Sequence, residues 1–589
     1  MISRGRSRRN STSSSASLST SQALRMGLVL VVASSAIYLF CTHSLLSQDS
    51  RIDAPNTRAP GKKRYYPNNN THFPGNGKGG DPVGDDDLIQ GQEDSPGVAT
   101  HGDDISSYSD TSGATHPMDY TELRCEGRKP EVDLSYWKDI QADKHYESPW
   151  GAAARAARDA GMPQYVTFEP DHGGFNNIRM AMETMLVFAR ETGRTLVMPP
   201  AQKFYLLSRP LVEFADMFPI EDLNPYMDII SMEEFLEKEG LTGRLGKQPP
   251  GGKNSGHETS VLKDYLREVA DLVPCWSHME QALVFGLSPD SPEVPTDDAS
   301  QAWLAEFLTE KRQKLTYNSE MQNARLIHFR SGGKNSNGRE YRLFTHFYTF
   351  IGFVDPVAAR YHRRLVRDVI HFRENLFCVA ATIVGRLRAA GQGTPGTWSG
   401  WYGEEGGLIG DSGEAEASEG GEDDFRTAGF STFHIRRGDF QYVKMKPPAE
   451  TIVEATEDLL KPGEVLYIAT DERDKSFFDP FRKDHRIFFL DDFEDILGGI
   501  HPSYYLMLDT IVASQGRVFV GTWRSTFTGY ITRLRGYYRY PTSFSWYFWN
   551  EAKTNYEPYS LDQDAIPRSP FFMREWPISW EGIDQDIWD

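Results

Sequence analysis

Apolar residues recur at two different spacings along the chain, and these spacings predict its elements. Near residue 165 the run YVTFEP is typical of a strand, and the loop DHGG follows it. From Asn177 to Thr192 apolar residues recur every three or four positions, which predicts a helix that Gly193 ends. The run TLVMPP predicts a second buried strand that stops at its two prolines. A strand, a helix and a strand in this order indicate a parallel sheet.

The same alternation resumes after residue 429. The runs STFHIR, VLYIATDE and RVFVGT predict three buried strands, and SYYLMLDTIVAS predicts a helix before the third. In STFTGYITRLRGYY, apolar residues at helical spacing predict a last helix that ends near Gly536. In the first half, residues 361–390 predict one long amphipathic helix. The pattern therefore predicts two α/β halves.

Two segments without apolar periodicity set the expected domain boundaries. Residues 48–160 are rich in Gly, Pro, Asn, Ser and Asp, which predicts a mostly disordered stem, with the stretch LSYWKDI as a candidate for the folded body. In residues 391–428 acidic residues are interleaved with glycine, which predicts an acidic insertion or linker rather than a binding segment. The expected folded domains are therefore 161–390 and 429–589. The aromatic C-terminal tail is expected to pack back onto the body instead of forming a carbohydrate platform.

An apolar segment near the N-terminus, Met26 to Ser47, has no formally charged residue and matches a bilayer crossing at about 1.5 Å per residue. Arginines without acidic residues precede it, so residues 1–25 are expected to be a cytosolic tail and the folded part to lie in the secretory lumen. A cleaved signal peptide is the alternative, although no A-x-A-like site closes the run. We therefore expect a single-pass type II membrane protein. The chain ends in DIWD and not in a retrieval signal such as KDEL, which favours the Golgi over the endoplasmic reticulum.

Charge and cysteine content narrow the function classes. A formal net charge of −20 argues against nucleic acid as the main partner. Cys41 lies in the apolar N-terminal segment, which leaves Cys125, Cys275 and Cys378 for one disulfide and one thiol, with the pairing open. No C-x-x-C motif exists, so a zinc or redox site has no support. The sequon at residues 69–71 is consistent with a lumenal glycoprotein but is common by chance.

The run FHIRRGDF has two arginines at the carboxyl end of a predicted strand. In open parallel sheets ligands bind beyond this edge, where His434, Arg436 and Arg437 are expected to lie. Because successive side chains point to opposite faces, only one arginine can face a given crevice. A guanidinium there suits a phosphate, since its planar fork donates paired hydrogen bonds and its charge does not titrate away. The alternative is a structural ion pair with Asp439 or other acids.

Three further positions are candidates for an anionic ligand. Ser525 and Thr526 lie between a strand end and a helix start, where unpaired N–H groups and the helix dipole attract an anion, although a simple N-cap is the alternative. The two glycines of DHGGFNN let the backbone approach a ligand, but the motif is neither G-x-G-x-x-G nor a P-loop, which disfavours a dinucleotide or nucleoside-triphosphate enzyme. Asp471 could accept hydrogen bonds from a base or ribose, or cap the next helix.

The acidic pair Asp491-Asp492 is considered as a metal site. It lacks an obvious third ligand, so no metal site is expected.

Four segments of the chain, taken in order, resemble the GDP-fucose protein O-fucosyltransferase family. These segments are GGFNNIRMAMETMLVFARETGRTLVMPP, FHIRRGDF, LYIATDE and FVGTWRSTFTGYITRLRG. The resemblance runs from about Gln164 to Tyr540, with 391–429 as an insertion. It implies a GT-B-like α/β fold, in which two Rossmann-like domains face each other across a cleft and the C-terminal one binds the nucleotide sugar. The activity it implies is inverting transfer of fucose from GDP-fucose to a Ser or Thr hydroxyl of a protein in the secretory pathway, with no cofactor and no metal.

The resemblance also implies roles for single residues. Arg436 would bind the β-phosphate of GDP-fucose and is the expected catalytic residue. The helix start would hold the diphosphate, Asp471 would help to hold the nucleoside, and the glycine loop would close the cleft. The expected nucleotide-sugar-binding residues are Gly173, Gly174, Phe175, Asn176, His434, Arg436, Asp471, Ser525, Thr526 and Phe527.

One departure from the family leaves the catalytic base unassigned. Some relatives carry a glutamate in the glycine loop where this chain has Gly173; Asp171 or His172 could substitute, or no side-chain base is used. Two other functions stay open: a fucosyltransferase that acts on a glycan hydroxyl, and a non-catalytic, membrane-tethered lumenal protein that binds a GDP-sugar or carbohydrate. The expected partners are GDP-fucose, a protein or glycoprotein acceptor, and the membrane through one N-terminal helix.

Overall fold

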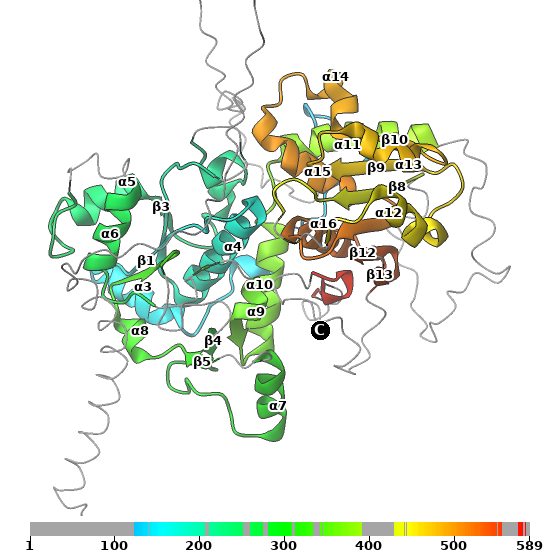
Figure 1. Cartoon of the computed structure of the whole chain (residues 1–589). Coiled ribbons are helices and arrows are strands. Elements are labelled where there is room, and N and C mark those ends of the chain that lie inside the picture. Colours follow the sequence, from blue (N-terminus) through cyan, green and yellow to red (C-terminus); the bar gives the residue numbers. More distant parts are fainter. Residues whose placement is uncertain are drawn as a thin grey trace, which may run out of the picture. The chain divides into compact units, whose positions relative to one another are not determined.

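In the computed structural model, β-sheets and the helices that cover them lie within residues 119–589 (Figure 1). The expected cytosolic tail, the membrane anchor and most of the acidic insertion lie outside the described residues, so these expectations stay predictions. No helix in the described part of the chain is long and apolar enough to span a bilayer. The described residues are 123–138, 141–204, 207, 211–250, 259–274, 281–308, 313–333, 342–343, 346–391, 429–440, 442, 445–549, 552–555, 575–580 and 583–584.

The first half of the chain contains a four-stranded parallel sheet in the order β3-β2-β1-β6. The predicted strand-helix-strand unit is confirmed, because α4 (Phe175–Thr192) connects β1 to β2 and these two strands pair in parallel. Gly193 ends α4 in the left-handed conformation, with φ of 68°. Almost every side chain of α4 is buried, since α4 contacts α3, α9, α10 and α16 as well as its own sheet. The strands are β1 (Tyr165–Phe168), β2 (Thr195–Met198), β3 (Ile229–Ser231) and β6 (Leu326–Phe329).

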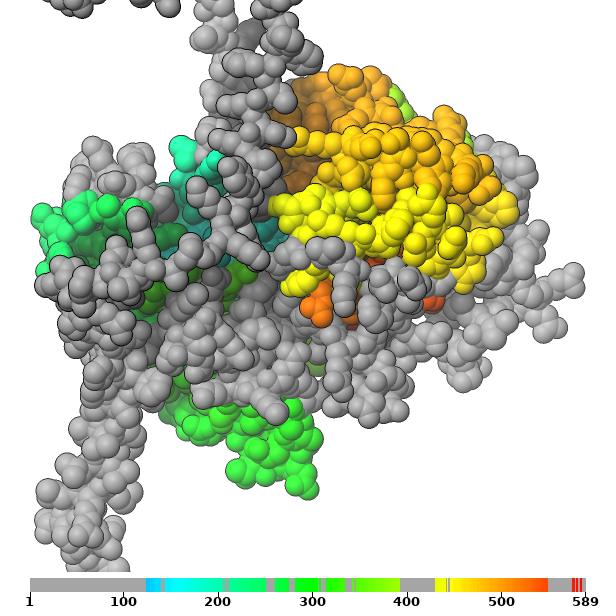
Figure 2. Space-filling view, in the orientation of Figure 1, coloured from blue at the N-terminus to red at the C-terminus, as the bar shows by residue number. Residues whose placement is uncertain are grey.

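A second, three-stranded parallel sheet in the order β5-β4-β7 also belongs to this half and was not predicted from the sequence. Its strands are β4 (Gln281–Phe285), β5 (Gln313–Thr316) and β7 (Ile351–Phe353). Helix α7 (Asp298–Phe307) connects β4 to β5 and projects beyond its neighbours, bright green at the bottom of Figures 1 and 2. Helix α9 (Phe347–Phe350) contacts β4, β7 and α4, and so joins this sheet to α4.

The second half contains a six-stranded sheet in the order β10-β9-β8-β11-β12-β13, in which only β13 is antiparallel. The three strands predicted from the sequence are its central ones, because β8 pairs with both β9 and β11. Their carboxyl ends therefore lie at one edge, and the parallel α/β fold is confirmed in both halves. The strands are β8 (Phe430–Ile435), β9 (Val465–Thr470), β10 (Arg486–Phe488), β11 (Phe519–Thr522), β12 (Ser545–Trp549) and β13 (Ala552–Asn555).

The single long helix predicted at 361–390 is wrong: the segment forms two helices, α10 (Pro356–Asp368) and α11 (Glu374–Gly391). Between them Ile370 and Phe372 are buried, so the apolar periodicity continues across the break and hides it. Helix α11 packs against α15, β8 and β9. The packing therefore places α11 with the second half, although the predicted first domain extends to residue 390.

The predicted stem is folded in its last part. In residues 123–160, the side chains of Leu123, Trp137 and Trp150 are buried, and Gly151–Asp159 form helix α3. These side chains pack against residues far along the chain; the ring of Trp137, for example, stacks at 4.1 Å on that of His371. Because their partners are distant in sequence, no local apolar periodicity predicts that they are buried. The predicted stem at 48–160 therefore includes residues that belong to the folded part of the protein.

A disulfide bond joins Cys125 to Cys378 of α11. This settles the pairing that the sequence left open, while Cys275 lies outside the described residues. The two cysteines are separated by 253 residues in sequence, so the bond attaches the beginning of the described chain, near Cys125, to helix α11 of the second half.

The described part of the aromatic tail packs onto the body, as expected. Trp576 and Trp580 are buried, and the ring of Trp580 lies 5.0 Å from that of Tyr537 at the end of α16. The helices flanking β11 are α15 (Tyr505–Ala513) and α16 (Thr526–Tyr537). The remaining α-helices are α2 (Gln141–Lys144), α5 (Met232–Phe235), α6 (Thr259–Val269), α8 (Ser319–Asn323), α12 (Ala449–Thr456), α13 (Asp479–Arg482) and α14 (Glu494–Leu497).

Candidate functional site

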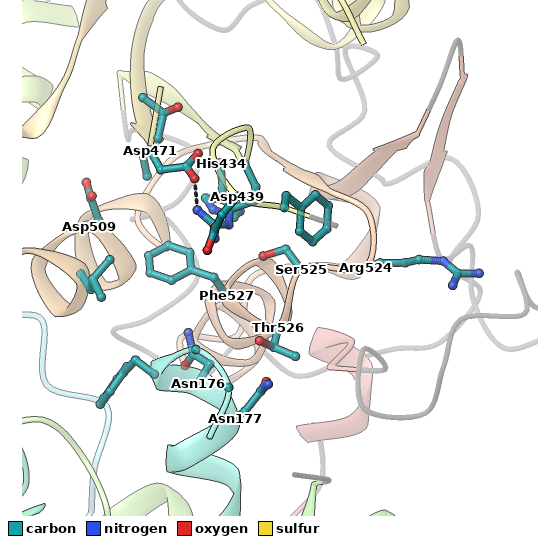
Figure 3. Close-up of a pocket in the computed structure, with 18 of the residues that line it drawn as sticks. Asn176, Asn177, His434, Asp439, Asp471, Asp509, Arg524, Ser525, Thr526 and Phe527 are labelled. Atoms are coloured by element: carbon teal, nitrogen blue, oxygen red, sulfur yellow. Dashed lines mark hydrogen bonds and ion pairs between the residues drawn. The ribbon is translucent and has the colours of Figure 1, made fainter. Parts of the chain in front are cut away.

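A cavity of about 420 Å³ opens where the loop after β1 meets the carboxyl ends of β8, β9 and β11 (Figure 3). Every residue predicted from the sequence to bind the nucleotide sugar lines this cavity, so the structure brings all of them together; their roles stay predictions. The additional lining residues, which the sequence-based site did not include, are Asn177, Arg342, Asp439, Phe440, Tyr442, Ala469, Thr470, Leu506, Asp509 and Arg524.

Arg436 follows the last residue of β8 and lines the cavity, whereas its neighbour Arg437 does not. The Arg437 guanidinium donates to Glu472 at 2.8 Å and lies 3.9 Å above the ring of Phe477. The alternation of side chains thus leaves one arginine at the site, as expected. The backbone N–H of Arg436 donates to Oγ1 of Thr522 at 2.9 Å, which fixes the end of β8 against β11.

The guanidinium of Arg436 forms ion pairs with Asp439 and Asp471, and its side chain is 19% exposed. Asp471 follows β9, and its Oδ1 also accepts a hydrogen bond of 2.6 Å from the backbone N–H of Arg437. Both the structural ion pair and the cavity-facing position considered for Arg436 are therefore present together. The contacts of Asp471 indicate that it orients Arg436; its predicted role toward a nucleoside stays untested.

His434, the second-last residue of β8, is buried beneath the cavity. Its Nδ1 lies 2.6 Å from Oγ1 of Thr528, and its ring lies 4.6 Å from that of Phe527. Burial, with a smaller contribution from the charge of Arg436, lowers the pKa of His434 to about 3. The imidazole is therefore neutral at physiological pH and supports the helix start that carries Phe527.

Helix α16 begins at the cavity, and Ser525 is its N-cap residue. The Ser525 side chain makes no capping hydrogen bond, so the simple N-cap considered from the sequence is not formed by it. Arg524 has φ of 64°, a left-handed conformation that is uncommon for a residue with a side chain. Figure 3 shows Arg524 extending away from the cavity while Ser525 turns toward it. Ser525, Thr526 and Phe527 line the cavity, so the N-terminus of this 12-residue helix lies at it, and a helix N-terminus suits an anion.

The glycine loop carries no candidate for a catalytic base. Gly173 itself has no side chain, and a Cβ there would lie 2.2 Å from Nδ2 of Asn177, so the Asn177 side chain would have to move to admit one. Asp171 is buried, and its two oxygens accept from Arg342 at 2.9 and 2.6 Å and from the N–H of Gly173 at 2.8 Å. His172 is exposed and does not line the cavity. Neither residue that could have replaced the family's glutamate is therefore placed to do so.

Asp509 of α15 is a cavity residue that the sequence-based site missed. Its Oδ1 accepts a hydrogen bond of 2.6 Å from the hydroxyl of Tyr467, and burial raises its pKa to about 7. The sequence did contain a signal, because Asp509 is the one charged residue in the apolar run SYYLMLDTIVAS. Within the described ranges, no three His, Cys, Asp or Glu side chains come together as metal ligands; the expected independence from metal stays a prediction.

The fold and the site together define a class of protein. A guanidinium and a helix N-terminus converge beyond the carboxyl ends of a parallel sheet, which is where α/β enzymes bind phosphorylated ligands. The family model for GDP-fucose protein O-fucosyltransferase matches residues 165–538. The chain belongs to this family, and the protein is therefore a glycosyltransferase.

Solved structures similar to this chain are also fucosyltransferases. POFUT1 in complex with GDP is 11% identical, with 63% of this chain and 94% of that chain covered and a TM-score of 0.29. The α-1,6-fucosyltransferase NodZ soaked with GDP-fucose is 13% identical (67% and 98% covered, TM-score 0.30), and Arabidopsis thaliana FUT1 with GDP is 10% identical (65% and 70% covered, TM-score 0.30). No curated protein matches the chain. Because all three TM-scores are low, the assignment to the family rests on the family model.

Proposed function

We propose that this protein transfers fucose from GDP-fucose to a Ser or Thr hydroxyl of a protein acceptor, with inversion at the sugar. The observation that carries the proposal is the joint position of Arg436 and the start of α16 on one cavity. The match to the O-fucosyltransferase family model supports the donor and the protein acceptor. In the named structures similar to this chain, POFUT1 is bound to GDP and NodZ was soaked with GDP-fucose.

The chemistry of the site suits this reaction. When the bond between fucose and GDP breaks, negative charge grows on the β-phosphate. The guanidinium of Arg436 and the N–H groups at the start of α16 are donors fixed in position before the reaction, so they stabilise this charge as it develops. Asp439 and Asp471 hold the guanidinium in place. Since these groups supply positive charge at the phosphate, we propose transfer without a divalent metal ion.

Asp509 is proposed to recognise the guanine base. Guanine presents two neighbouring N–H donors, at N1 and at the exocyclic amine, which an ionised carboxylate accepts well. Asp439 and Asp471, which lie in the loops after β8 and β9, are paired with Arg436, whereas Asp509 lies on helix α15 and contacts the Tyr467 hydroxyl (Figure 3). Asp509 is thus the cavity carboxylate best suited to the base.

The cellular setting is proposed as the secretory lumen, with residues 26–47 as the membrane anchor and the Golgi as the compartment. The Cys125–Cys378 disulfide supports a lumenal position, because such bonds persist in oxidising compartments and are rare in the cytosol. The apolar N-terminal segment and the arginines before it support the type II orientation.

A donor and acceptor screen tests the proposed function. Purified full-length protein in detergent is incubated with several nucleotide sugars, and nucleotide release is measured with and without protein acceptors, with EDTA added in a parallel series. We expect GDP release from GDP-fucose only, stimulated by a protein acceptor and resistant to EDTA. Fucose recovered on an oligosaccharide would instead indicate a glycan acceptor, and tight GDP binding without turnover would indicate a non-catalytic binding protein.

A further inference from the structure

Asn176, in the first turn of α4, faces the cavity from the half opposite Arg436. Its side chain is 4% exposed, and its Oδ1 accepts a hydrogen bond of 3.1 Å from Nε of Arg179. An arginine can only donate, so the atom of Asn176 that faces it must be the carbonyl oxygen. The NH2 group of Asn176 is therefore turned away from Arg179, and Figure 3 shows this nitrogen on the side of Phe527.

Arg179 is itself held by groups from both halves of the protein. It is fully buried and pairs with Glu183 one turn further along α4. Its guanidinium lies 3.6 Å above the ring of Tyr530, a residue of α16. Glu183 in turn accepts from Arg533 of α16 at 2.8 and 3.0 Å. The side chain that orients Asn176 is thus fixed relative to the helix whose start faces the same cavity.

The charges around Arg179 are balanced. Two guanidiniums, of Arg179 and Arg533, meet two carboxylates, of Glu183 and Glu575, and all four side chains are buried. Among the described residues, Glu183 accepts from Nη1 of Arg179 and Asn176 accepts from Nε, while Nη2 has no hydrogen-bond partner. The contact with Asn176 links the charged group to the cavity.

We propose that Arg179 is a positioning residue of the donor site, which turns the NH2 group of Asn176 into the cavity as a hydrogen-bond donor to the diphosphate. The inference rests on the proposed function, since it takes a sugar diphosphate as the ligand. Asn176 touches the ligand in this arrangement, and Arg179 acts only through Asn176. The diphosphate is then bound from two sides, by α16 and Arg436 on one and by Asn176 on the other.

A double-mutant cycle tests this role. The full-length protein, Asn176→Ala, Arg179→Met and the double variant are compared by their dissociation constants for GDP, measured by isothermal titration calorimetry. Loss of a hydrogen bond to a charged group predicts about tenfold to a hundredfold weaker binding for each single variant. If Arg179 acts through Asn176, the double variant binds GDP no more weakly than Asn176→Ala alone. Losses that multiply in the double variant would overturn the proposal.

A charge-balanced background separates positioning from folding. Arg179→Met leaves one buried carboxylate in excess, whereas Arg179→Met with Glu183→Gln removes one charge of each sign and keeps the pair of Arg533 with Glu575. In this background we expect GDP binding to stay weak and Asn176→Ala to weaken it no further. Recovery of wild-type GDP affinity in this background would show that Arg179 serves charge balance alone. Failure of the wild-type protein to bind GDP contradicts the proposed function itself, whereas multiplying losses contradict only the role of Arg179.

Discussion

Arg533 of α16 and Glu183 of α4 form a fully buried ion pair, in which Nη1 lies 2.8 Å from Oε2. The same guanidinium donates from Nε to Glu575 of the C-terminal segment at 2.8 Å. The guanidinium of Arg533 in α16 therefore contacts two other parts of the chain, α4 and the C-terminal segment. Because α4 and α16 both begin at the cavity, this contact holds the two helix starts relative to each other.

Removing one member of this buried group is expected to destabilise the protein strongly. Arg533→Met leaves Glu183 paired with Arg179 but removes the guanidinium from Glu575, so one buried carboxylate is in excess and the free energy of unfolding falls by about 3–5 kcal/mol. Arg533→Met combined with Glu575→Gln keeps the pair of Arg179 with Glu183 and should lower it by less. Urea denaturation followed by circular dichroism measures both values. Equal losses in the single and double variants would speak against charge balance as the cause.

Arg436→Ala is expected to reduce fucose transfer by about 10²–10³, the effect of removing one preorganised donor from a developing negative charge. GDP release in the presence of acceptor measures the loss, and circular dichroism confirms that the variant is folded. Arg437→Ala is the matched control, because this neighbouring side chain pairs with Glu472 outside the cavity and should leave most of the activity. Similar losses in both variants would show that the arginines act through the fold and not at the phosphate.

The fold follows from the sequence where one strand is joined to the next by a single helix with regular apolar spacing. Helix α4 is such a case, since its apolar spacing and Gly193 are both local signals. The break between α10 and α11 could not be predicted, because Ile370 and Phe372 keep an apolar pattern while the backbone leaves the helix. The three-stranded sheet was missed because its strands are short and are separated by long connections.

The affinity for GDP-fucose is expected to rise about tenfold between pH 6 and pH 8 if Asp509 binds guanine. Burial raises the pKa of Asp509 to about 7, so the carboxyl is mostly protonated at pH 6 and ionised at pH 8, when it can accept both N–H groups of the base. GDP-fucose is the suitable ligand, because its diphosphate has no terminal phosphate that titrates in this range. Fluorescence or calorimetric titration at each pH measures the change.

Asp509→Asn should bind GDP-fucose more weakly than the wild-type protein and show no dependence on pH in this range. Its amide presents an NH2 group to the donors of guanine, so one of the two hydrogen bonds is lost. If the variant kept the wild-type pH dependence, another group would be responsible for it.

Gly173→Ala is expected to weaken GDP binding more than Gly174→Ala does. The added Cβ on Gly173 would lie 2.2 Å from Asn177 Nδ2, 2.7 Å from Asp171 Oδ2 and 2.8 Å from Arg342 Nη2, so the ends of these cavity-side side chains must move and the contacts of Asp171 with Arg342 are disturbed. At Gly174 nothing lies within 4 Å of an added Cβ. The ratio of the two dissociation constants for GDP measures the effect, and a larger loss in Gly174→Ala would contradict it.

The candidate site could be predicted only where its residues follow a strand. Arg436 and the start of α16 were found because the end of a strand and the start of a helix are visible in the sequence, and parallel strands bring such ends together. Asp509 and Arg342 reach the cavity through tertiary packing; the lone charge of Asp509 in an apolar run is a signal that it is special, but it does not show which site the residue joins. The same holds for Arg179, whose partners come from α16 as well as from its own helix.

The disulfide between Cys125 and Cys378 has a practical consequence for producing this protein. A recombinant fragment that begins at residue 165, where the family match starts, would lack Cys125 and leave the thiol of Cys378 free to cross-link two molecules. It would also uncover the surface that Trp137 and Trp150 occupy. Soluble, monodisperse material therefore requires a fragment that starts ahead of Leu123 and is expressed in a host compartment that oxidises thiols.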